Sequence, residues 1–365
     1  MNTSTSAAPP PLRIGIVGVG FMGRQHVEFV RRSRRAELAA VADPRVGLED
    51  LGCPAYRDLD EMMDAASLDA VIIVNPNQDH VDTALACLEH DVAVLLEKPV
   101  ATSYAESLRL TEAIEREGGR LLVGHHRRHH PAISRVREAL ADGAIGDIVG
   151  VSGMWAVRKE DDYFTDIEWH RRPGAGVTLI NLVHDLDLLR HVCGEIVEIQ
   201  AMLSSSTREL EVEDTVSVTV RFENGALGSF LATDAGASPW GWDQATEESM
   251  EFPYVPGGVA YRIAGTAGAL SVPDLAHYTY AAGVSPNWHS PLSRTFLPVR
   301  PVNSFDTQLE HFIDVARGEV EPLVSAADAA RTLALVEALH QSAHTRETVD
   351  LAEFRAERKR LARGL

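Results

Sequence analysis

The stretch LRIGIVGVGFMGRQH (residues 12–26) decides the fold of the first part of the chain. A short apolar run leads into Gly18, Gly20 and Gly23, which have the spacing G-x-G-x-x-G. In a turn between a strand and a helix, the first glycine permits the tight turn and the second lets a pyrophosphate approach the backbone. The third lets the helix pack closely on the strand. The stretch therefore predicts a dinucleotide site.

Strands and helices alternate around this turn, from residue 12 to residue 124. The apolar runs predict strands at 12–18, 37–43, 68–74, 92–98 and 121–124, separated by helices at 22–32, 58–65, 78–89 and 104–116. Continuous apolar runs are typical of strands that are covered on both faces. Repeated β-α units with short connections predict an α/β fold with a doubly wound parallel sheet. We expect a Rossmann domain over residues 12–127, preceded by a disordered lead-in at 1–11.

An acidic residue, Asp43, ends the second predicted strand 20 residues after Gly23. A carboxylate at this place accepts hydrogen bonds from the ribose hydroxyls and would repel a 2′-phosphate, so we predict NAD as the cofactor. Arg45 follows closely and could meet a 2′-phosphate, which keeps NADP as the alternative. Phe21 and Met22, at the start of the helix after the turn, complete the predicted cofactor contacts in this region.

The pattern changes after residue 127, where we expect a second domain at 128–365. The segment DTVSVTVRF (residues 214–222) alternates polar and apolar residues, and an Asn224-Gly225 turn leads from it into another apolar run. These signals predict a β-hairpin with one buried face. We expect an α+β domain with a large, mostly antiparallel, open-faced sheet, and a loop at 235–258. Ser325 and Asp328 resemble a capping box that opens a helix at about 325–341, which packs back toward the first domain.

Composition limits the kinds of partner. The formal net charge of the 365-residue chain is −19, which repels phosphate backbones and anionic lipid, so we expect no nucleic acid and no membrane partner. The three cysteines, Cys53, Cys87 and Cys193, lack C-x-x-C spacing and favour reduced thiols in a cytoplasmic protein. The N-terminal segment lacks the basic and apolar regions of a secretory signal.

Polar residues also follow the later predicted strands, where an open parallel sheet binds its ligands. We expect cofactor contacts from Asn75, Pro76, Asn77 and His80 after one strand and from Glu97 and Lys98 at the end of the next. A half-buried lysine at such a place can move a proton or hold a substrate hydroxyl, because burial lowers the pKa of its ammonium group. The alternatives are a solvated lysine, a turn asparagine and a helix-surface histidine.

The stretch GVTLINLVHDLDLLR (residues 176–190) predicts an amphipathic helix. Its apolar stripe consists of Leu179, Leu182, Val183, Leu186 and Leu189. These residues recur at steps of three and four. Asn181 and His184 fall on the far side of that stripe, one turn apart. This side either faces water or carries substrate-binding residues, and nothing within the stretch decides between the two.

Two basic clusters stand out in this acidic chain: HHRRHHP (residues 125–131) and EWHRRPGAG (168–176). Either their residues are exposed and balance nearby acids, or some of them bind an anionic or polyhydroxy substrate. We select Arg127, Trp169 and Arg172 as candidate substrate contacts. His125 and His129 have the i, i+4 spacing of metal ligands, but the arginines between them would repel a cation, so we predict no metal site.

Five segments in order resemble the Gfo/Idh/MocA oxidoreductases, a family named for glucose–fructose oxidoreductase and inositol dehydrogenase. They are VGVGFMG, NPNQDHVDTALACLEH, EKP, GHHRRHHP and LINLVHDLDLL, and the resemblance extends from about residue 12 to 345. It implies a nicotinamide cofactor, with Lys98 beside the nicotinamide and His184 as the histidine that bonds the substrate hydroxyl. It also implies a homodimer or homotetramer that packs through the open face of the second sheet.

The chain departs from the family pattern at one place. The family has an aspartate four residues before this histidine, where Ile180 stands here. We therefore expect Lys98 to be the main proton-transfer group, with His184 and Asn181 positioning the substrate.

These features together predict an NAD(P)-dependent dehydrogenase or reductase. Its small-molecule substrate would be a sugar, a cyclitol or a related polyhydroxy acid, oxidised or reduced at a secondary alcohol or ketone. Two alternatives stay open. Some relatives break a glycosidic bond by transient oxidation and elimination with tightly held NAD. A non-catalytic dinucleotide sensor could use the same scaffold.

Overall fold

The computed structural model describes residues 9–45, 49–172, 174–248, 252–300 and 302–364. The chain divides into two compact units. The first comprises the residues up to Thr102 together with Glu106–His125 and Phe305–Ala330, and the second comprises Ser103–Ala105, His126–Ser304 and the residues from Arg331 onward. Each unit is built on its own β-sheet. No helix within the described ranges is both long and apolar enough to span a membrane.

The first unit contains a six-stranded sheet, sheet A, in the order β3-β2-β1-β4-β5-β6. Its strands are β1 (Leu12–Val17), β2 (Ala36–Ala42), β3 (Ala55–Tyr56), β4 (Ala70–Ile73), β5 (Ala93–Leu96) and β6 (Leu121–Val123). All neighbouring pairs are parallel. Every residue of β4 and β5 is buried, as expected for strands covered on both faces. The predicted doubly wound parallel sheet is confirmed.

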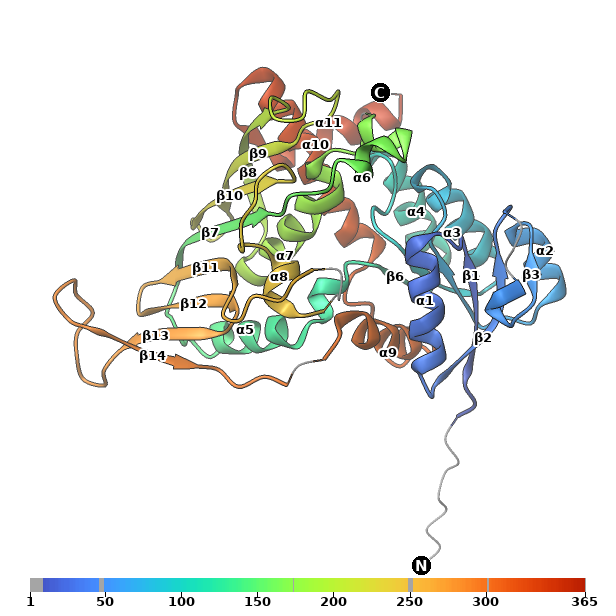
Figure 1. The fold of residues 1–365 in the computed structure, drawn as a ribbon, viewed down its shortest axis with the longest axis horizontal. Coiled ribbons are helices and arrows are strands. Elements are labelled where there is room, and N and C mark those ends of the chain that lie inside the picture. The colour runs from blue at the N-terminus through green and yellow to red at the C-terminus, as the bar shows by residue number, and fades with distance from the viewer. Residues whose placement is uncertain (1–8, 46–48, 173, 249–251, 301, 365) are drawn as a thin grey trace, which may run out of the picture. The chain divides into compact units, whose positions relative to one another are not determined.

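Helices of the first unit follow the predicted alternation. They are α1 (Phe21–Arg32), α2 (Leu59–Ala65), α3 (His80–Glu89) and α4 (Tyr104–Glu117), and α9 (Ser304–Ala316) joins them from late in the sequence. The rings of Phe29 in α1 and Phe305 in α9 stack with centroids 5.1 Å apart. Ser33 also donates a hydrogen bond to Glu310 over 2.7 Å. These contacts attach α9 to α1, beside which it lies in Figure 1.

The second unit contains a nine-stranded sheet, sheet B, in the order β14-β13-β12-β11-β7-β10-β9-β8-β15. Its strands are β7 (Ile148–Ala156), β8 (Ile196–Ser204), β9 (Thr215–Phe222), β10 (Leu227–Thr233), β11 (Val259–Gly265), β12 (Gly268–Pro273), β13 (Ala276–Tyr280), β14 (Leu292–Phe296) and β15 (Val349–Asp350). Neighbouring pairs are antiparallel except for β7 and β10, which run parallel. The predicted, mostly antiparallel sheet is confirmed.

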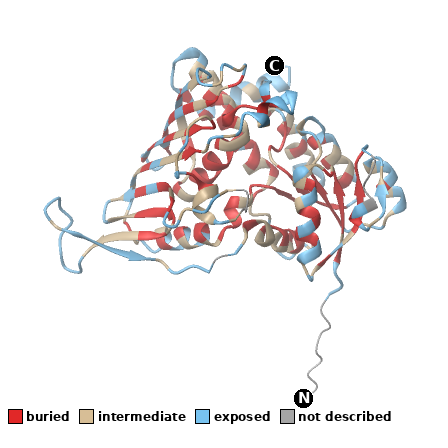
Figure 2. Cartoon of the chain, viewed as in Figure 1, coloured by how far each residue is buried: buried red, intermediate tan, exposed pale blue. Residues whose placement is uncertain are grey.

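One face of sheet B is covered by helices and the other is open. The helices of this unit are α5 (Pro131–Ala141), α6 (Asp162–Thr165), α7 (Val183–Cys193), α8 (Trp242–Thr246), α11 (Leu351–Ala362) and, from Arg331 onward, α10 (Ala326–Thr345). In β9, the valines and Phe222 are buried while Ser217, Thr219 and Arg221 are exposed. The alternation that predicted a half-buried strand is thus seen in the burial pattern (Figure 2). At the start of α10, Ser325 Oγ accepts from the Asp328 N–H over 3.2 Å, which confirms the predicted cap.

Candidate active site

The predicted cofactor residues of the first unit follow the carboxyl ends of neighbouring strands. Gly18 follows β1, Asp43 follows β2, Asn75 lies two residues after β4, and Lys98 lies two residues after β5. Because these strands are parallel and adjacent, their carboxyl ends share one edge of sheet A. Ligands of open α/β sheets bind along such an edge.

The glycine turn has the geometry that a pyrophosphate requires. Gly18 has φ +89°, and a Cβ atom there would lie 2.6 Å from the Val74 carbonyl. A Cβ at Gly23 would lie 2.1 Å from the Gly18 carbonyl oxygen, so the close approach of α1 to the turn excludes any side chain. At Gly20, in contrast, a Cβ would meet no described atom within 4 Å. Protein packing therefore requires glycine at positions 18 and 23, whereas Gly20 leaves open space for a ligand.

Asp43 holds the glycine turn and carries a charge. Its Oδ2 atom accepts from the Val19 N–H over 2.7 Å, and its two oxygens accept from Arg45 Nε over 2.7 Å and Nη2 over 2.5 Å. The hydrogen bond from Arg45 lowers the pKa of the Asp43 carboxyl to about 2, although burial opposes that shift. At neutral pH the edge of the sheet beside the turn thus presents a carboxylate, next to an Arg45 side chain that is 61% exposed.

His80 joins the loops after β4 and β5. Its Nδ1 atom lies 2.7 Å from the Pro99 carbonyl oxygen and its Nε2 atom 3.0 Å from the Asn75 carbonyl oxygen. Carbonyl oxygens only accept, so only the doubly protonated ring can donate to both. Burial lowers the pKa of His80 and disfavours that charge, while the two carbonyls oppose this shift. The buried ring therefore ties the two loops together.

Glu97 is also held within the protein. Its Oε1 atom lies 2.9 Å from His26 Nε2 of α1, and its Oε2 atom accepts from the Lys98 N–H over 3.1 Å. Burial raises the pKa of this carboxyl, but the hydrogen bond from His26 and the nearby charges outweigh burial and hold the pKa below its ordinary value. Glu97 thus fixes the backbone at Lys98, whose own side chain is half-buried.

The remaining predicted cofactor residues of this unit are accessible. Phe21 opens α1 and is 62% exposed, Met22 is half-buried, Pro76 is exposed and Asn77 is half-buried. Asn75 donates through Nδ2 to Thr83 Oγ1 over 2.8 Å. Its Oδ1 atom is buried and meets no hydrogen-bond partner among the described residues.

In the second unit, a π-helical turn (Thr178–Leu182) precedes α7. Such turns are rare and occur often at functional sites. His184 is 8% exposed, and its ring makes an edge contact with His126, with centroids 5.2 Å apart. Ile180 and Asn181 are half-buried, and Asn181 Oδ1 meets no hydrogen-bond partner among the described residues. His126 was not among our sequence candidates, because nothing distinguishes it from the other histidines of HHRRHHP.

The predicted amphipathic character of this helix needs correction, because α7 is buried on its polar side too. Every residue from Leu182 to Arg190 is buried. Arg127 Nη1 donates to Asp185 over 2.9 Å. Arg128 donates to both oxygens of Asp187, through Nε over 2.7 Å and Nη2 over 2.6 Å. The arginines of the first basic cluster therefore neutralise the acids of α7, which explains why so polar a helix can be buried.

Arg127, a predicted substrate contact, lies in the core of the second unit. Its side chain is only 4% exposed and also approaches Asp243 at 3.4 Å. The Tyr261 hydroxyl donates to the same Asp185 oxygen. Burial raises the pKa of Asp185 to about 6, against the opposing effect of Arg127. The guanidinium of Arg127 is thus occupied by carboxylates of its own unit.

The other two predicted substrate contacts lie on the segment after β7. Trp169 is 51% exposed, and its ring contacts His170 with centroids 4.4 Å apart. Arg172 is exposed and pairs with Glu168 over 2.5 Å. Both side chains remain accessible to a ligand.

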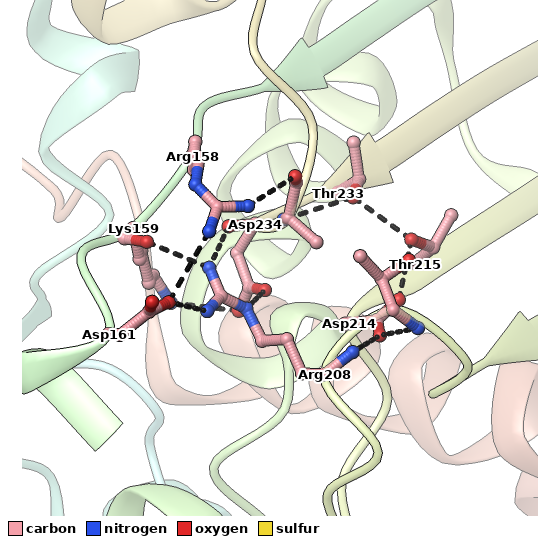
Figure 3. A network of polar contacts seen from close by, with 10 residues as sticks. Arg158, Lys159, Asp161, Arg208, Asp214, Thr215, Thr233 and Asp234 are labelled. Carbon is pink, nitrogen blue, oxygen red and sulfur yellow. Dashed lines mark hydrogen bonds and ion pairs between the residues drawn. The ribbon is translucent and has the colours of Figure 1, made fainter. Parts of the chain in front are cut away.

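A buried polar network anchors this segment to the ends of the strands (Figure 3). Arg208 donates through Nε to Asp234 over 2.9 Å and through Nη2 to the Lys159 carbonyl over 2.8 Å. The Lys159 ammonium lies 3.5 Å from Asp234 and 4.7 Å from the centre of the Tyr163 ring. Asp214 accepts from the Arg208 N–H over 2.9 Å. The segment that carries Trp169 is therefore fixed at its start by paired charges.

No described group of three or more histidine, cysteine or carboxylate residues could hold a metal ion. Within the same ranges, Cys53, Cys87 and Cys193 are free thiols.

The sequence matches two family models in succession. Residues 12–125 match the model described as oxidoreductase family, NAD-binding Rossmann fold, and residues 133–271 match the GFO/IDH/MocA C-terminal domain. The chain belongs to the GFO/IDH/MocA oxidoreductase family. The resemblance inferred from the five segments is confirmed, and with it an oxidoreductase whose first unit is an NAD-binding Rossmann fold.

Other GFO/IDH/MocA proteins resemble the chain over most of its length. The rhizopine catabolism protein MocA of Rhizobium meliloti is 27% identical over 332 residues, which cover 89% of this chain and 93% of the relative. Myo-inositol 2-dehydrogenase of Thermotoga maritima is 26% identical and covers 94% of this chain and 99% of its own. An oxidoreductase of Agrobacterium radiobacter, solved with NAD+, L-tartaric acid and magnesium, shares the fold with a TM-score of 0.78. It is 20% identical and covers 94% of this chain and 99% of its own.

Proposed function

We propose that the protein is a dehydrogenase that oxidises a secondary alcohol of a sugar, a cyclitol or a related polyhydroxy acid, or reduces the matching ketone, with NAD. The open space at Gly20, in a turn that Asp43 holds, carries this proposal, because it fits a dinucleotide and is not needed for packing. When bound, the nicotinamide accepts or returns the hydride. The names of the inositol dehydrogenase and of the tartrate-bound oxidoreductase support the substrate class.

The residues that would hold the cofactor lie along the edge of sheet A where the strands have their carboxyl ends. Gly18, Gly20, Gly23, Phe21 and Met22 would surround the pyrophosphate, Asp43 would accept from the ribose, and Asn75, Pro76 and Asn77 would line the nicotinamide end. Glu97 and His80 are buried and bonded within the protein. We assign these two residues the positioning of Lys98 and of the Asn75 loop, without direct contact to the cofactor.

Lys98 is the proposed proton-transfer group, and His184 and Asn181 would hold the substrate hydroxyl. A lysine can release and regain its proton when its surroundings lower its pKa, which an arginine cannot do. Ile180 offers no carboxylate to stabilise a charged His184, so the main role falls to Lys98. Trp169 and Arg172 would contact the far end of the substrate, and Arg172 would favour an anionic group there. Arg127 is left out of this set because carboxylates occupy its guanidinium.

A substrate panel tests the proposal. Polyols, cyclitols and sugar acids are incubated with NAD or NADP while the absorbance of the reduced nicotinamide is followed. Formation of NADH with at least one member supports a dehydrogenase. Cleavage of an aryl glycoside with retained NAD and no net NADH would favour the glycosidase, and NAD binding without turnover of any substrate class would favour the sensor.

Valine substitutions at Gly20 and Gly23 separate cofactor binding from folding. Gly20→Val is expected to abolish measurable NAD binding with little change in Tm, because the new side chain fills only the open space. Gly23→Val is expected to lower Tm, because its Cβ cannot fit 2.1 Å from the Gly18 oxygen. Calorimetric titration with NAD and thermal unfolding measure both effects. Unchanged NAD affinity in Gly20→Val would contradict the proposed pyrophosphate site.

Replacing Asp43 tests the choice of cofactor. Asp43→Ser is expected to weaken NAD binding roughly 10- to 100-fold, the equivalent of losing hydrogen bonds to a charged group. The same change frees Arg45 from its carboxylate partner, so NADP binding should strengthen. Dissociation constants for both cofactors are measured on the variant and on Arg45→Ala as a control. NAD affinity that stays at the wild-type level would refute the ribose contact.

For assembly and location, we propose a cytoplasmic homodimer or homotetramer that packs through the open face of sheet B. The resemblance to the family supports the assembly, and the free thiols of Cys53, Cys87 and Cys193 support the location.

A further inference from the structure

The start of the π-helical turn before α7 is held by Glu213, which lies 35 positions after Thr178 in the sequence. Its Oε1 atom accepts from the Thr178 N–H over 3.1 Å and from the Thr178 hydroxyl, and its carbonyl oxygen accepts from the Val177 N–H over 3.2 Å. The first N–H groups of a helix lack partners within the helix, and a negative charge there is favourable because of the helix dipole. Val177, which precedes the turn, has an apolar side chain and cannot supply such a bond. Glu213 therefore caps the turn from another part of the chain.

Gly176 makes room for this carboxylate. A Cβ atom at position 176 would collide with the carboxylate oxygens of Glu213. The φ angle of Gly176 lies outside the left-handed region, so the backbone conformation does not require a glycine here. The Gly176 carbonyl accepts from the Ile180 N–H over 3.2 Å, so this residue also takes part in the hydrogen bonds of the turn. The close approach of Glu213 to the backbone thus explains the glycine.

Thr178 is also bonded by a second element, α10. His340 Nε2 lies 2.9 Å from Thr178 Oγ1. A threonine hydroxyl has one hydrogen, which Thr178 donates to the Glu213 carboxylate, so the histidine donates to the hydroxyl oxygen. Thr178 is 1% exposed, so water does not compete for these bonds. The hydroxyl thus fixes the start of the turn between α10 and the segment before β9.

The backbone that carries Glu213 is itself held in place. The next residue, Asp214, accepts through Oδ2 from the N–H groups of Thr207 and Arg208, each over 2.9 Å. Figure 3 shows Asp214 in its polar network, beside Arg208 and beside Thr215, where β9 begins. Asp214 therefore anchors the segment from which the Glu213 side chain reaches the turn.

The turn determines how Asn181 is placed relative to His184. The Val183 N–H is bonded to the Thr178 carbonyl, five residues earlier, whereas a regular α-helix bonds residues that are four apart. Because the π-turn contains an additional residue, its conversion to a regular turn would rotate Asn181 about the helix axis relative to His184. The residue that accepts this long bond, Thr178, is the one whose N–H and hydroxyl Glu213 holds.

We propose that Glu213 is a positioning residue for the substrate: through Thr178, its carboxylate keeps the π-turn that directs Asn181 and His184 to the substrate hydroxyl. This inference rests on the proposed function, in which these two residues hold that hydroxyl. Glu213 is half-buried and acts through the turn, without contact to the substrate. The sequence alone did not single it out, because nothing in residues 211–215 shows which segment its carboxylate meets.

Steady-state kinetics of Glu213 variants, with the best substrate of the panel, test the proposal on the full chain. Glu213→Met keeps the length of the side chain and loses both acceptor oxygens, so kcat/KM should fall about 10²-fold, the loss that a misplacement of about 1 Å can cause. Glu213→Gln keeps an acceptor oxygen and should recover most of this loss. The dissociation constant of NAD should stay unchanged in both. A Glu213→Met variant with wild-type kcat/KM, or a Glu213→Gln variant that is equally impaired, would overturn the proposal.

Asp350 provides a matched control for the loss of a helix cap. It lies in the same unit and accepts from the N–H groups of Ala352 and Glu353 at the start of α11, each over 2.8 Å. Asp350→Leu removes both acceptor oxygens, so its Tm should fall, as in Glu213→Met, while kcat/KM should stay at the wild-type level. An equal fall of kcat/KM in both variants would mean that Glu213 only stabilises the fold, which would also overturn the proposal.

NMR of protein labelled with carbon-13 in its histidine rings tests the position of His184 without turnover, after its signal is assigned by its loss in His184→Gln. The ring lies 5.2 Å from that of His126, so a displacement changes its chemical shift. The signal should move in Glu213→Met and stay in Asp350→Leu. Thr178→Val, which loses only the hydroxyl bonds, should also move it and replaces Glu213→Met if that variant does not fold. An unmoved signal would overturn the proposal, whereas a wild type that turns over no substrate would overturn the proposed function alone.

Discussion

Lys98→Met is expected to lower kcat by about 10²- to 10⁴-fold, the range for loss of a general acid–base group. Methionine keeps the length of the side chain and loses the proton. The backbone at this position is held by the hydrogen bond from its N–H to Glu97, so the substitution should leave the loop in place, and the fall in kcat should far exceed any change in NAD affinity. Steady-state turnover with the best substrate of the panel gives kcat and KM separately, and calorimetry gives the dissociation constant of NAD.

The chain offers a matched control for this experiment. Only three of the 34 lysine and arginine residues in the sequence are lysines: Lys98, Lys159 and Lys359. The chain uses arginine almost everywhere else, so the lysine at position 98 is unusual for this sequence. Lys359 is exposed on α11, and Lys359→Met should leave kcat unchanged. Lys98→Arg keeps the charge but cannot release its proton, so its kcat should also fall. Wild-type turnover in Lys98→Met would remove Lys98 from the proposed chemistry.

Arg127→Met is expected to reduce the free energy of unfolding by about 3–5 kcal/mol, the usual cost of leaving one partner of a buried ion pair alone. Asp185 is 0% exposed, so the carboxylate cannot recover its lost partner from water. The variant Arg127→Met with Asp185→Asn removes both charges and should regain much of the loss. Urea unfolding of the wild type, Arg127→Met and the double variant measures the three free energies of unfolding. Arg172→Met, on the exposed surface, is the control. A loss below about 1 kcal/mol, as for exposed ion pairs, would contradict the burial argument.

The pH dependence of this pair follows from the pKa of Asp185, which burial raises to about 6. An unfolded aspartate has a pKa of about 3.9. Between these values the folded protein binds more protons than the unfolded chain, so the contribution of Asp185 to stability falls as pH rises from about 4 to about 6 and is level above. The defect of Arg127→Met should therefore be smaller at pH 5 than at pH 8. An equal defect at both pH values would argue against a carboxyl that titrates in this range.

The sequence predicted the first unit well because its signals are local. Short apolar runs and three glycines were sufficient to define a parallel sheet and its phosphate turn. The second unit was harder. All of β14 is exposed, so it lacks the apolar alternation that identified β9, and α11 also went unpredicted. Two elements of the first unit, α9 and β3, were missed as well. The two-residue strand β3 is too short to leave a pattern.

Long-range pairing explains what the sequence could not predict about the candidate site. The bond from His26 to Glu97 joins residues 71 positions apart, and the bond from Arg127 to Asp185 joins residues 58 positions apart. A single sequence shows that these charged residues exist but not which of them meet. Glu97 and Arg127 were therefore predicted as ligand contacts, although their partners lie within the protein.

The two arginine–aspartate pairs of α7 have a consequence for His184. Successive residues of an α-helix are about 100° apart around its axis, so Asp185 and Asp187 point in nearly opposite directions. Arg127 holds one and Arg128 holds the other, which resists rotation of the helix about its own axis. His184 directly precedes the first of these aspartates. Because the rotation of the helix is fixed, the direction of this imidazole is fixed through its backbone, which offers a reason why the chain can carry Ile180 where the family pattern led us to expect an aspartate.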